Sequence, residues 1–174
     1  LEDALSAIKS SKKPVIIAGG GVHYSDATET LLRFAEQHDI PVTETQAGKS
    51  ALPHDHLLNL GSLGVTGTSA ANSLAEEADL LIAVGTRLQD FTTGSWALFK
   101  NPDRKIIGVN IQSFDATKHR SLPLVGDART SLTSLGQGLG DWKASSGWSG
   151  NGITKYQSWL SSANEVTEPS DQTH

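Results

Sequence analysis

The feature that most constrains the fold is an apolar run that lies between an acidic residue and a glycine. Residues 78–90 read Ala-Asp-Leu-Leu-Ile-Ala-Val-Gly-Thr-Arg-Leu-Gln-Asp. Because helices cover both faces of a parallel sheet, its strands are continuously hydrophobic rather than alternating. Residues 80–84 have this character, and Gly85 follows where a side chain would obstruct a turn. The run therefore predicts a buried parallel strand that ends at a ligand-facing loop.

A second segment has the same order of features. Residues 14–22 read Pro-Val-Ile-Ile-Ala-Gly-Gly-Gly-Val, and a helix is predicted over residues 26–38. A strand, a glycine turn and a helix form the plan of nucleotide-binding folds, in which backbone N–H groups approach a phosphate. The full G-x-G-x-x-G pattern is missing, and we expect no acid in the ribose position at the end of the second strand. Tight packing of helix on strand is the alternative explanation for the glycines.

The rest of the chain completes a doubly wound pattern. Further strands are predicted over residues 41–45, 57–60, 104–111 and 122–125, and further helices over 68–77 and 129–139. Parallel neighbours require crossover connections. We therefore expect an α/β fold: a Rossmann-like, six-stranded parallel sheet of order 3-2-1-4-5-6 with helices on both faces. This order places residues 19–21 beside residues 85–87 at the switch point, where such sheets bind ligands.

Length and composition predict one domain and a tail. The chain has 174 residues, of which 37% are hydrophobic, and a domain commonly has about 100–150 residues. From Gly140 onward the composition shifts to Ser, Gly, Asn and Trp, which is typical of a linker. We expect a domain over 1–140 and a linker or tail over 141–174, with one short helix at 153–160. The tryptophans at 96, 142, 148 and 159 would pack on this domain or dock the tail onto a neighbouring one.

Charge and residue usage exclude several classes of function. The formal net charge is −5, the isoelectric point is near 5.6, and no run of lysine or arginine exists, which argues against nucleic acid and anionic membranes as partners. No window approaches the roughly 20 apolar residues of a membrane helix. The absence of cysteine removes disulfides, zinc thiolate sites and thiol nucleophiles. We expect a cytoplasmic protein that handles small molecules and, because it contains no methionine, a piece of a longer chain.

A few polar residues near the turns are candidates for chemistry. Arg87 follows the central strand and has the fork geometry to bind a phosphate, while Asp90 would hold it or accept from a ribose; a structural Arg–Asp pair is the alternative. His54 and His56 flank an aspartate, but no third metal ligand is in view, so we expect surface residues. His23 follows the glycine turn and is a candidate general base, although no recognisable spacing supports that role.

Five segments, taken together and in order, resemble a known family. They are residues 16–21, 40–45, 60–68, 78–87 and 125–128. Their order is similar to that in the central domain of thiamine diphosphate-dependent enzymes of the acetolactate synthase and pyruvate oxidase type, and the resemblance covers residues 1–140. Within that family, residues 44–49 and 85–94 are most similar to the inositol-catabolic hydrolases that act on 3D-(3,5/4)-trihydroxycyclohexane-1,2-dione.

The resemblance implies what the parent enzyme does and which parts are missing here. The parent would use thiamine diphosphate and magnesium to cleave a carbon–carbon bond of the ring, release 5-deoxy-glucuronate and assemble as a homo-oligomer. Its N-terminal and C-terminal domains would hold these cofactors, so we expect no catalytic residue and no metal ligand in this chain. Gly126-Asp127-Ala128 followed by Asn151 resembles the family's diphosphate motif, but Ala128 replaces its third glycine.

The acetolactate synthase branch binds FAD in this domain. The resemblance places the contacts at Gly20, Gly21, Thr45, Gln46, Ala47, Gly64, Val65, Gly85, Thr86 and Arg87. Flavin-binding members carry histidine where Thr66 stands, arginine where Phe91 stands and aspartate where Asn110 stands. Each lost charge-assisted bond weakens binding by roughly 1–3 kcal/mol. We therefore expect no retained FAD, and an empty cleft or an ADP-like ligand that also contacts Asn110; a self-sufficient nucleotide-binding module is the alternative function.

Overall fold

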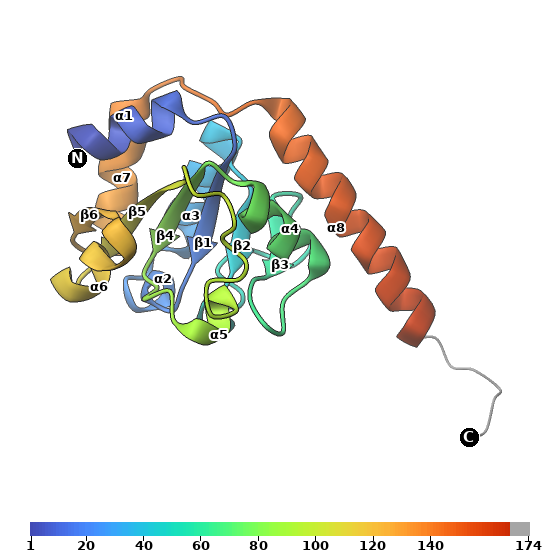
Figure 1. The fold of residues 1–174 in the computed structure, drawn as a ribbon. Helices are drawn as coiled ribbons and strands as arrows, with labels where there is room; N and C mark the ends of the chain where they lie inside the picture. Colours follow the sequence, from blue (N-terminus) through green and yellow to red (C-terminus); the bar gives the residue numbers. More distant parts are fainter. Residues whose placement is uncertain (168–174) are drawn as a thin grey trace.

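The computed structural model describes residues 1–167 and contains a six-stranded, all-parallel sheet (Figure 1). Its order is β3-β2-β1-β4-β5-β6, which confirms the predicted order. The strands are β1 (Pro14–Ala18), β2 (Val42–Glu44), β3 (Asn59–Ser62), β4 (Leu80–Val84), β5 (Lys105–Asn110) and β6 (Leu122–Val125).

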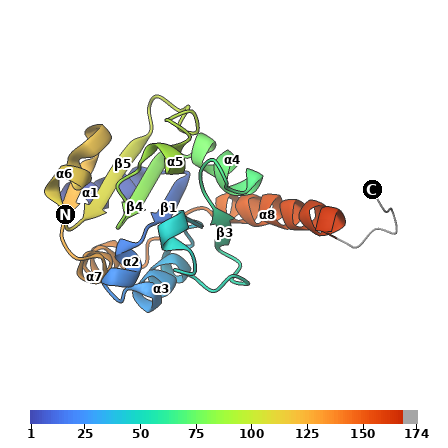
Figure 2. The same cartoon turned by 90° about the horizontal axis from the view of Figure 1, so that it is seen from below.

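Helices cover both faces of this sheet. The α-helices are α1 (Glu2–Ser10), α2 (Gly21–Tyr24), α3 (Thr28–His38), α4 (Ser69–Glu77), α5 (Asp90–Thr93), α6 (Ser113–Thr117), α7 (Ala128–Leu139) and α8 (Ser146–Thr167), with 3₁₀ turns η1 (Gln46–Gly48) and η2 (Lys118–Arg120). Helices α3 and α7 lie on one face, and α4 and α8 lie on the other (Figure 2). Within residues 1–167, no helix combines the length and the apolar character that crossing a bilayer demands.

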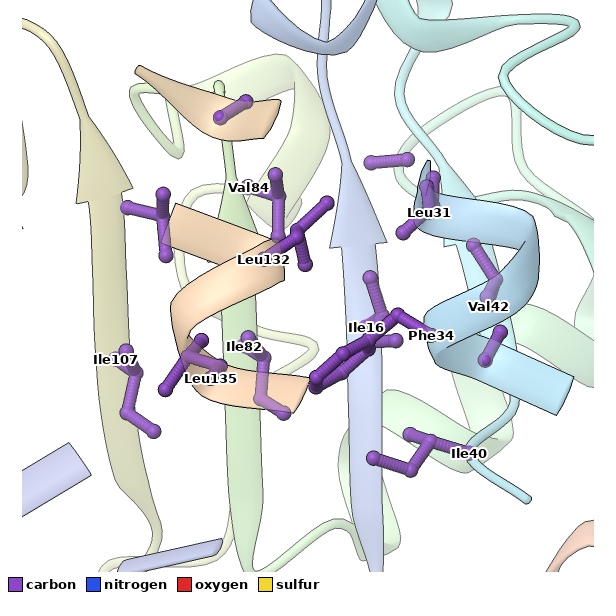
Figure 3. Close-up of a cluster of buried hydrophobic side chains, with 14 of the residues drawn as sticks. Ile16, Leu31, Phe34, Ile40, Val42, Ile82, Val84, Ile107, Leu132 and Leu135 are labelled. Atoms are coloured by element: carbon purple, nitrogen blue, oxygen red, sulfur yellow. The ribbon is translucent and has the colours of Figure 1, made fainter. Parts of the chain in front are cut away.

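Strand β4 lies at the centre of the core, and this position explains its continuous hydrophobicity. All five of its residues are buried, and Ile82 is paired with Ile16 of β1 and Ile107 of β5. These three isoleucines point toward α3 and α7, and Leu135 of α7 belongs to the same cluster (Figure 3). Leu81 points to the opposite face, into the cluster that α4 and α8 cover. Because both faces are covered, neither set of alternating positions can be polar.

The tail differs from its prediction as a linker with one short helix at 153–160. Helix α8 begins at Ser146, and the structure describes it as far as Thr167. Trp148 is buried, and its indole N–H donates to the Pro14 carbonyl at 2.8 Å. Gly152 lies so close to α4 that a Cβ there would be 2.9 Å from Leu74. Ser, Gly and Asn disfavour helix, but contacts with the domain offset this preference. The boundary near residue 140 stays a prediction.

The predicted helix over 26–38 also differs in detail. The chain forms the short helix α2 first, and α3 begins only at Thr28. Asp26 adopts a positive φ of 48°, which interrupts helical geometry between the two. The glycine turn after β1 is therefore followed by one short helical turn, which places Tyr24 and Ser25 at the carboxyl end of the sheet.

Candidate functional site

A cleft of about 620 Å³ opens at the carboxyl end of the sheet, where β1 and β4 meet at the switch point. Nine of the eleven predicted site residues line it: Gly20, Gly21, Thr45, Gln46, Ala47, Gly85, Thr86, Arg87 and Asn110. The other lining residues are Tyr24, Ser25, Gln89, Thr92, Val109, Ile111, Asp115, Gly126, Asp127 and Ala128. The predicted residues therefore converge on one cleft, and their role in binding stays a prediction.

Two predicted contacts, Gly64 and Val65, do not line this cleft. They lie behind α5, where the Val65 N–H donates to the Phe91 carbonyl at 3.0 Å. Gly64 has a φ of +115°, and a Cβ there would be 2.5 Å from the same carbonyl oxygen. The pair supports α5, whose Thr92 does line the cleft. Any effect on a ligand would pass through α5.

The glycines at the switch point pack backbone against backbone. The Gly21 N–H donates to the Gly85 carbonyl at 3.0 Å, and the Gly19 N–H donates to the Val84 carbonyl at 2.8 Å. A Cβ on Gly19 would be 2.4 Å from the Gly85 oxygen, and a Cβ on Gly85 would be 2.5 Å from the Gly21 Cα. Packing of one turn on the other therefore accounts for these three glycines without any ligand.

Asn110 joins the ends of β4 and β5. Its side-chain amide donates to the Thr86 carbonyl at 3.3 Å, and its side-chain oxygen accepts from the Gln112 N–H at 3.0 Å. An ionised aspartate at this position has no donor for the Thr86 carbonyl. The asparagine therefore fits the local backbone of this chain. By the resemblance, flavin-binding members carry an aspartate at this position.

Arg87 is exposed at the cleft and uses only part of its guanidinium. Its Nε donates to the Gln89 side-chain oxygen at 3.2 Å. Within the part of the chain that the structure describes, Arg87 makes no ion pair, so the alternative pair with Asp90 is absent. Asp90 begins α5 and does not line the cleft. The terminal nitrogens of Arg87 are available for an anionic ligand.

Two carboxylates also face the cleft, and each has an intramolecular partner. Asp115 pairs with Lys118 at 2.5 Å. Asp127 caps α7 by accepting the Thr130 N–H at 3.0 Å. Hydrogen bonding from the Ser25 hydroxyl, followed by that from Thr130, holds the pKa of Asp127 below its usual value. The carboxylate is therefore ionised at neutral pH, so the cleft combines the guanidinium of Arg87 with a nearby anion.

An acid does end the second strand, but it does not stand in the ribose position. Glu44 is the last residue of β2. Its carboxylate is buried, and it accepts the Ser50 N–H at 3.2 Å and the Leu52 N–H at 3.0 Å. These bonds turn the acid into the loop that follows β2, so Glu44 does not line the cleft. It stabilises a loop and is not placed to accept from a ribose.

Two of the three candidate histidines, His23 and His56, make structural contacts. The His56 Nε2 lies 3.1 Å from a Glu36 carboxylate oxygen, and its Nδ1 accepts the Leu58 N–H at 3.2 Å. His54 is exposed. His23 does not line the cleft, and its Nε2 lies 3.0 Å from the Lys49 carbonyl. Across residues 1–167, no three His, Cys, Asp or Glu side chains gather as a metal site would require.

The apparent diphosphate motif is divided between two ends of the sheet. Residues 126–128 join β6 to α7 at the carboxyl end, as expected for the last strand of this domain. Asn151 lies on α8, in a separate groove that Lys12 and Lys13 line just before β1. The two parts of the motif therefore do not form one site.

Comparison with known proteins matches this chain to one family. The family model described as "Thiamine pyrophosphate enzyme, central domain" matches residues 1–135. Relatives named 3D-(3,5/4)-trihydroxycyclohexane-1,2-dione hydrolase include one from Clostridium tetani, 53% identical over 139 residues, which are 80% of this chain and 22% of the relative. One from Clostridium perfringens is 53% identical over 134 residues, which are 77% of this chain and 21% of the relative.

A third relative of that name, "hydrolase 1" from Bacillus cereus, is 51% identical over 135 residues, which are 78% of this chain and 21% of the relative. The chain therefore spans about a fifth of the length of the curated relatives it matches. Because the family model covers 135 of the 174 residues, this chain belongs to the family of thiamine pyrophosphate enzyme central domains.

Proposed function

We propose that this chain is the central domain of a longer thiamine diphosphate-dependent enzyme that hydrolyses 3D-(3,5/4)-trihydroxycyclohexane-1,2-dione. The observation that carries the proposal is the identity of 50% or more with hydrolases of that name, over a segment that is only about a fifth of their length. The domain's task is to position flanking catalytic domains in a cytoplasmic homo-oligomer. The product implied by the resemblance is 5-deoxy-glucuronate.

The residues of this chain do not fit a site for thiamine diphosphate and magnesium. Asp127, the acid of the apparent motif, caps α7 instead of facing other carboxylates. In the described part of the chain no cluster of acidic side chains is available for a cation. When bound, the cofactor supplies the carbanion chemistry of carbon–carbon cleavage. We assign its binding to the flanking domains, and the chain by itself to a non-catalytic role.

The cleft at the switch point suits a small anionic ligand better than FAD. Its volume of about 620 Å³ lies within the usual range for ligand sites. Arg87 is available for a phosphate, but the positions of two further charged contacts in flavin-binding members hold Phe91 and Asn110. We propose that the cleft does not retain FAD, and that it is empty or holds an ADP-like ligand.

A stand-alone nucleotide-binding module is the second candidate function. One observation favours it: the chain by itself forms a cleft of ligand size at the switch point. Tight binding of a dinucleotide by the chain alone would support this function over the role of a scaffold.

Consumption of the trihydroxycyclohexanedione tests the main proposal. The uninterrupted natural polypeptide is assayed with and without added thiamine diphosphate and magnesium, with the 174-residue chain alongside. Turnover by the full polypeptide only when cofactor is present, and none by the shorter chain, is the expected result. Absence of turnover by the cofactor-loaded polypeptide would refute the assigned substrate and direct the assay to pyruvate and other 2-oxo acids.

Calorimetric titration with ADP and FAD tests the cleft. If ADP binds, Arg87→Ala should weaken binding by about tenfold or more, because a charge-assisted hydrogen bond contributes roughly 1.5–3 kcal/mol. Arg33→Ala is the matched control, since Arg33 is exposed on α3 and pairs with Glu29 of the same helix. A yellow protein on purification would contradict the expected loss of FAD.

A further inference from the structure

Helix α8 has two halves with different surroundings. Its first half packs on the domain, where Trp148 is buried and Lys155 donates to the Ser73 hydroxyl at 2.7 Å and pairs with Glu77. From Gln157 to Thr167, the side-chain hydrogen bonds within the described chain all donate to carbonyls of α8 itself. The second half extends past β3 and α4, away from the body of the domain (Figures 1 and 2).

One face of α8 continues from the packed half into the extended half. Positions at alternating spacings of three and four residues share this face, which is the repeat of a helix packing seam. They are Ser149, Gly152, Tyr156, Trp159, Ala163 and Val166, and we call them the α8 seam. The first two are buried against the domain, and Tyr156 lies against Gly61 of β3. The seam is therefore a continuation of an existing contact.

The distal part of the α8 seam is apolar and becomes less covered toward its end, because Tyr156 packs on the domain and Trp159 and Ala163 are half-buried. Tyr156 and Trp159 are stacked, with ring centroids 5.7 Å apart and an interplanar angle of 12°. Val166 is 85% exposed, and Leu160, next to the seam, is 38% exposed. The opposite face holds the exposed polar residues Gln157, Ser158, Ser161 and Ser162. This distribution is typical of a helix whose apolar side faces a partner.

Helix propensity also points to a partner. Four serines and asparagines, with Val166 and Thr167, make up more than half of residues 157–167, and all of these residue types are weaker helix formers than alanine. Isolated helices shorter than about 12–15 residues are marginal in water even for alanine-rich sequences. The extended half continues a helix that packing on the domain already starts, so its own sequence adds little further stability, and packing along the seam would stabilise it more.

We propose that the distal α8 seam, from Tyr156 to Val166, docks into an apolar groove on another domain of the same longer polypeptide. The inference rests on the proposed function, in which this chain is one domain of a multidomain enzyme. The segment that relatives share with this chain is about a fifth of their length, so most of such a polypeptide lies outside it. The helix itself lies beyond residues 1–135, which the family model matches.

The size of the seam favours this occupant over a second copy of the chain. Eleven helical residues form a strip of roughly 16 Å by 10 Å. A stable complex between separate chains buries about 800 Å² on each partner, which is several times this footprint. A covalently linked domain has an effective concentration near the millimolar range, so a small contact suffices to hold it.

Hydrogen exchange of the full natural polypeptide tests the proposal. Peptides over 157–167 should be protected about as well as peptides over 147–156 of the same helix. Trp159→Ala should accelerate exchange over 157–167 by about tenfold or more, because it removes the largest side chain of the seam. Ser158→Ala is the matched control on the exposed face and should leave exchange unchanged or slower, since alanine favours helix.

Three results would overturn the proposal. The first is rapid exchange over 157–167 in the unmodified polypeptide, and the second is an equal response to Trp159→Ala and Ser158→Ala. The third is protection that disappears when dilution separates the protomers, as followed by light scattering, because the seam would then contact a second copy. Turnover is measured on the same samples, so a protected seam without turnover refutes only the substrate, and turnover without protection refutes only the docking.

Discussion

Three glycine substitutions separate the two physical reasons for glycine at the switch point. Gly94→Ala, at the end of α5, serves as a reference that changes mainly the backbone strain, because Gly94 has a φ of +55° and a Cβ there would be 3.3 Å from the Leu98 side chain, which is flexible enough to shift. Gly19→Ala changes only the packing, because a Cβ there would be 2.4 Å from the Gly85 oxygen and its φ is not in the left-handed region. Gly85→Ala combines both effects.

The expected losses of unfolding free energy follow from these geometries. Gly94→Ala should cost about 1 kcal/mol, since a left-handed conformation costs an L-residue roughly 1–2 kcal/mol and loss of unfolded-state entropy offsets part of it. Gly19→Ala should cost about 2–3 kcal/mol, at the upper end for overpacking, because the opposing atom is backbone and cannot rotate away. Gly85→Ala should cost about 3–4 kcal/mol, the sum of the two effects.

Urea unfolding at neutral pH, followed by far-ultraviolet circular dichroism, measures all three values. The slope of free energy against urea should stay constant, because the surface exposed on unfolding is nearly the same in each variant. A stability for Gly19→Ala within about 0.5 kcal/mol of the unmodified chain would refute the reasoning. The two turns would then have room to separate, and glycine at these positions would need a ligand as its explanation.

Three further changes test the core and the contacts of α8. Trp148→Phe should cost about 1–2 kcal/mol of unfolding free energy in urea, because it leaves the buried Pro14 carbonyl without its donor. Leu135→Ala should cost about 2–5 kcal/mol in the same assay, since it opens a cavity under α7. The hydrogen bond from Lys155 is the largest cause of the lowered pKa of Glu77. The ionised carboxylate therefore stabilises the fold at and above its usual pKa of 4.5, and this stabilisation is lost as the pH falls through the lower pKa of the folded state. Acid titration of Lys155→Met should therefore show a shallower loss of stability below about pH 4.5 than the unmodified chain.

The sequence predicts secondary structure best where all residues of an element are buried. Strands β4 and β6 are found at their predicted residues, and β4 is identifiable because helices cover both of its faces. Crossover connections predict parallel pairing, and the Rossmann-like order expected with it brings most of the predicted site residues together. These features depend on patterns that a few consecutive residues carry by themselves.

The sequence predicts less where a distant contact decides the local structure. The serines and glycines of α8 favour a linker, and only contacts such as Trp148 with Pro14 outweigh that preference. The orientation of Glu44 depends on backbone N–H groups of the loop that follows it. Asp115 and Asp127 line the cleft but were not among the predicted site residues. Both follow strands, β5 and β6, whose carboxyl ends lie at the ligand-binding edge of the sheet, and this position is the sequence signal that could have identified them.

A glycine-rich turn beside a strand supports two different conclusions, and the structure separates them. Gly19, Gly21 and Gly85 are in mutual backbone contact, so a chain needs glycine there to close the sheet whether or not a nucleotide binds. Evidence for a ligand must instead come from polar groups that the fold leaves without a partner. Within residues 1–167 the terminal nitrogens of Arg87 are such groups at this cleft, whereas its Nε, Asn110 and Asp127 are already bonded to the protein. Packing alone therefore explains the glycine turns, and the polar chemistry that the cleft offers a ligand depends chiefly on Arg87.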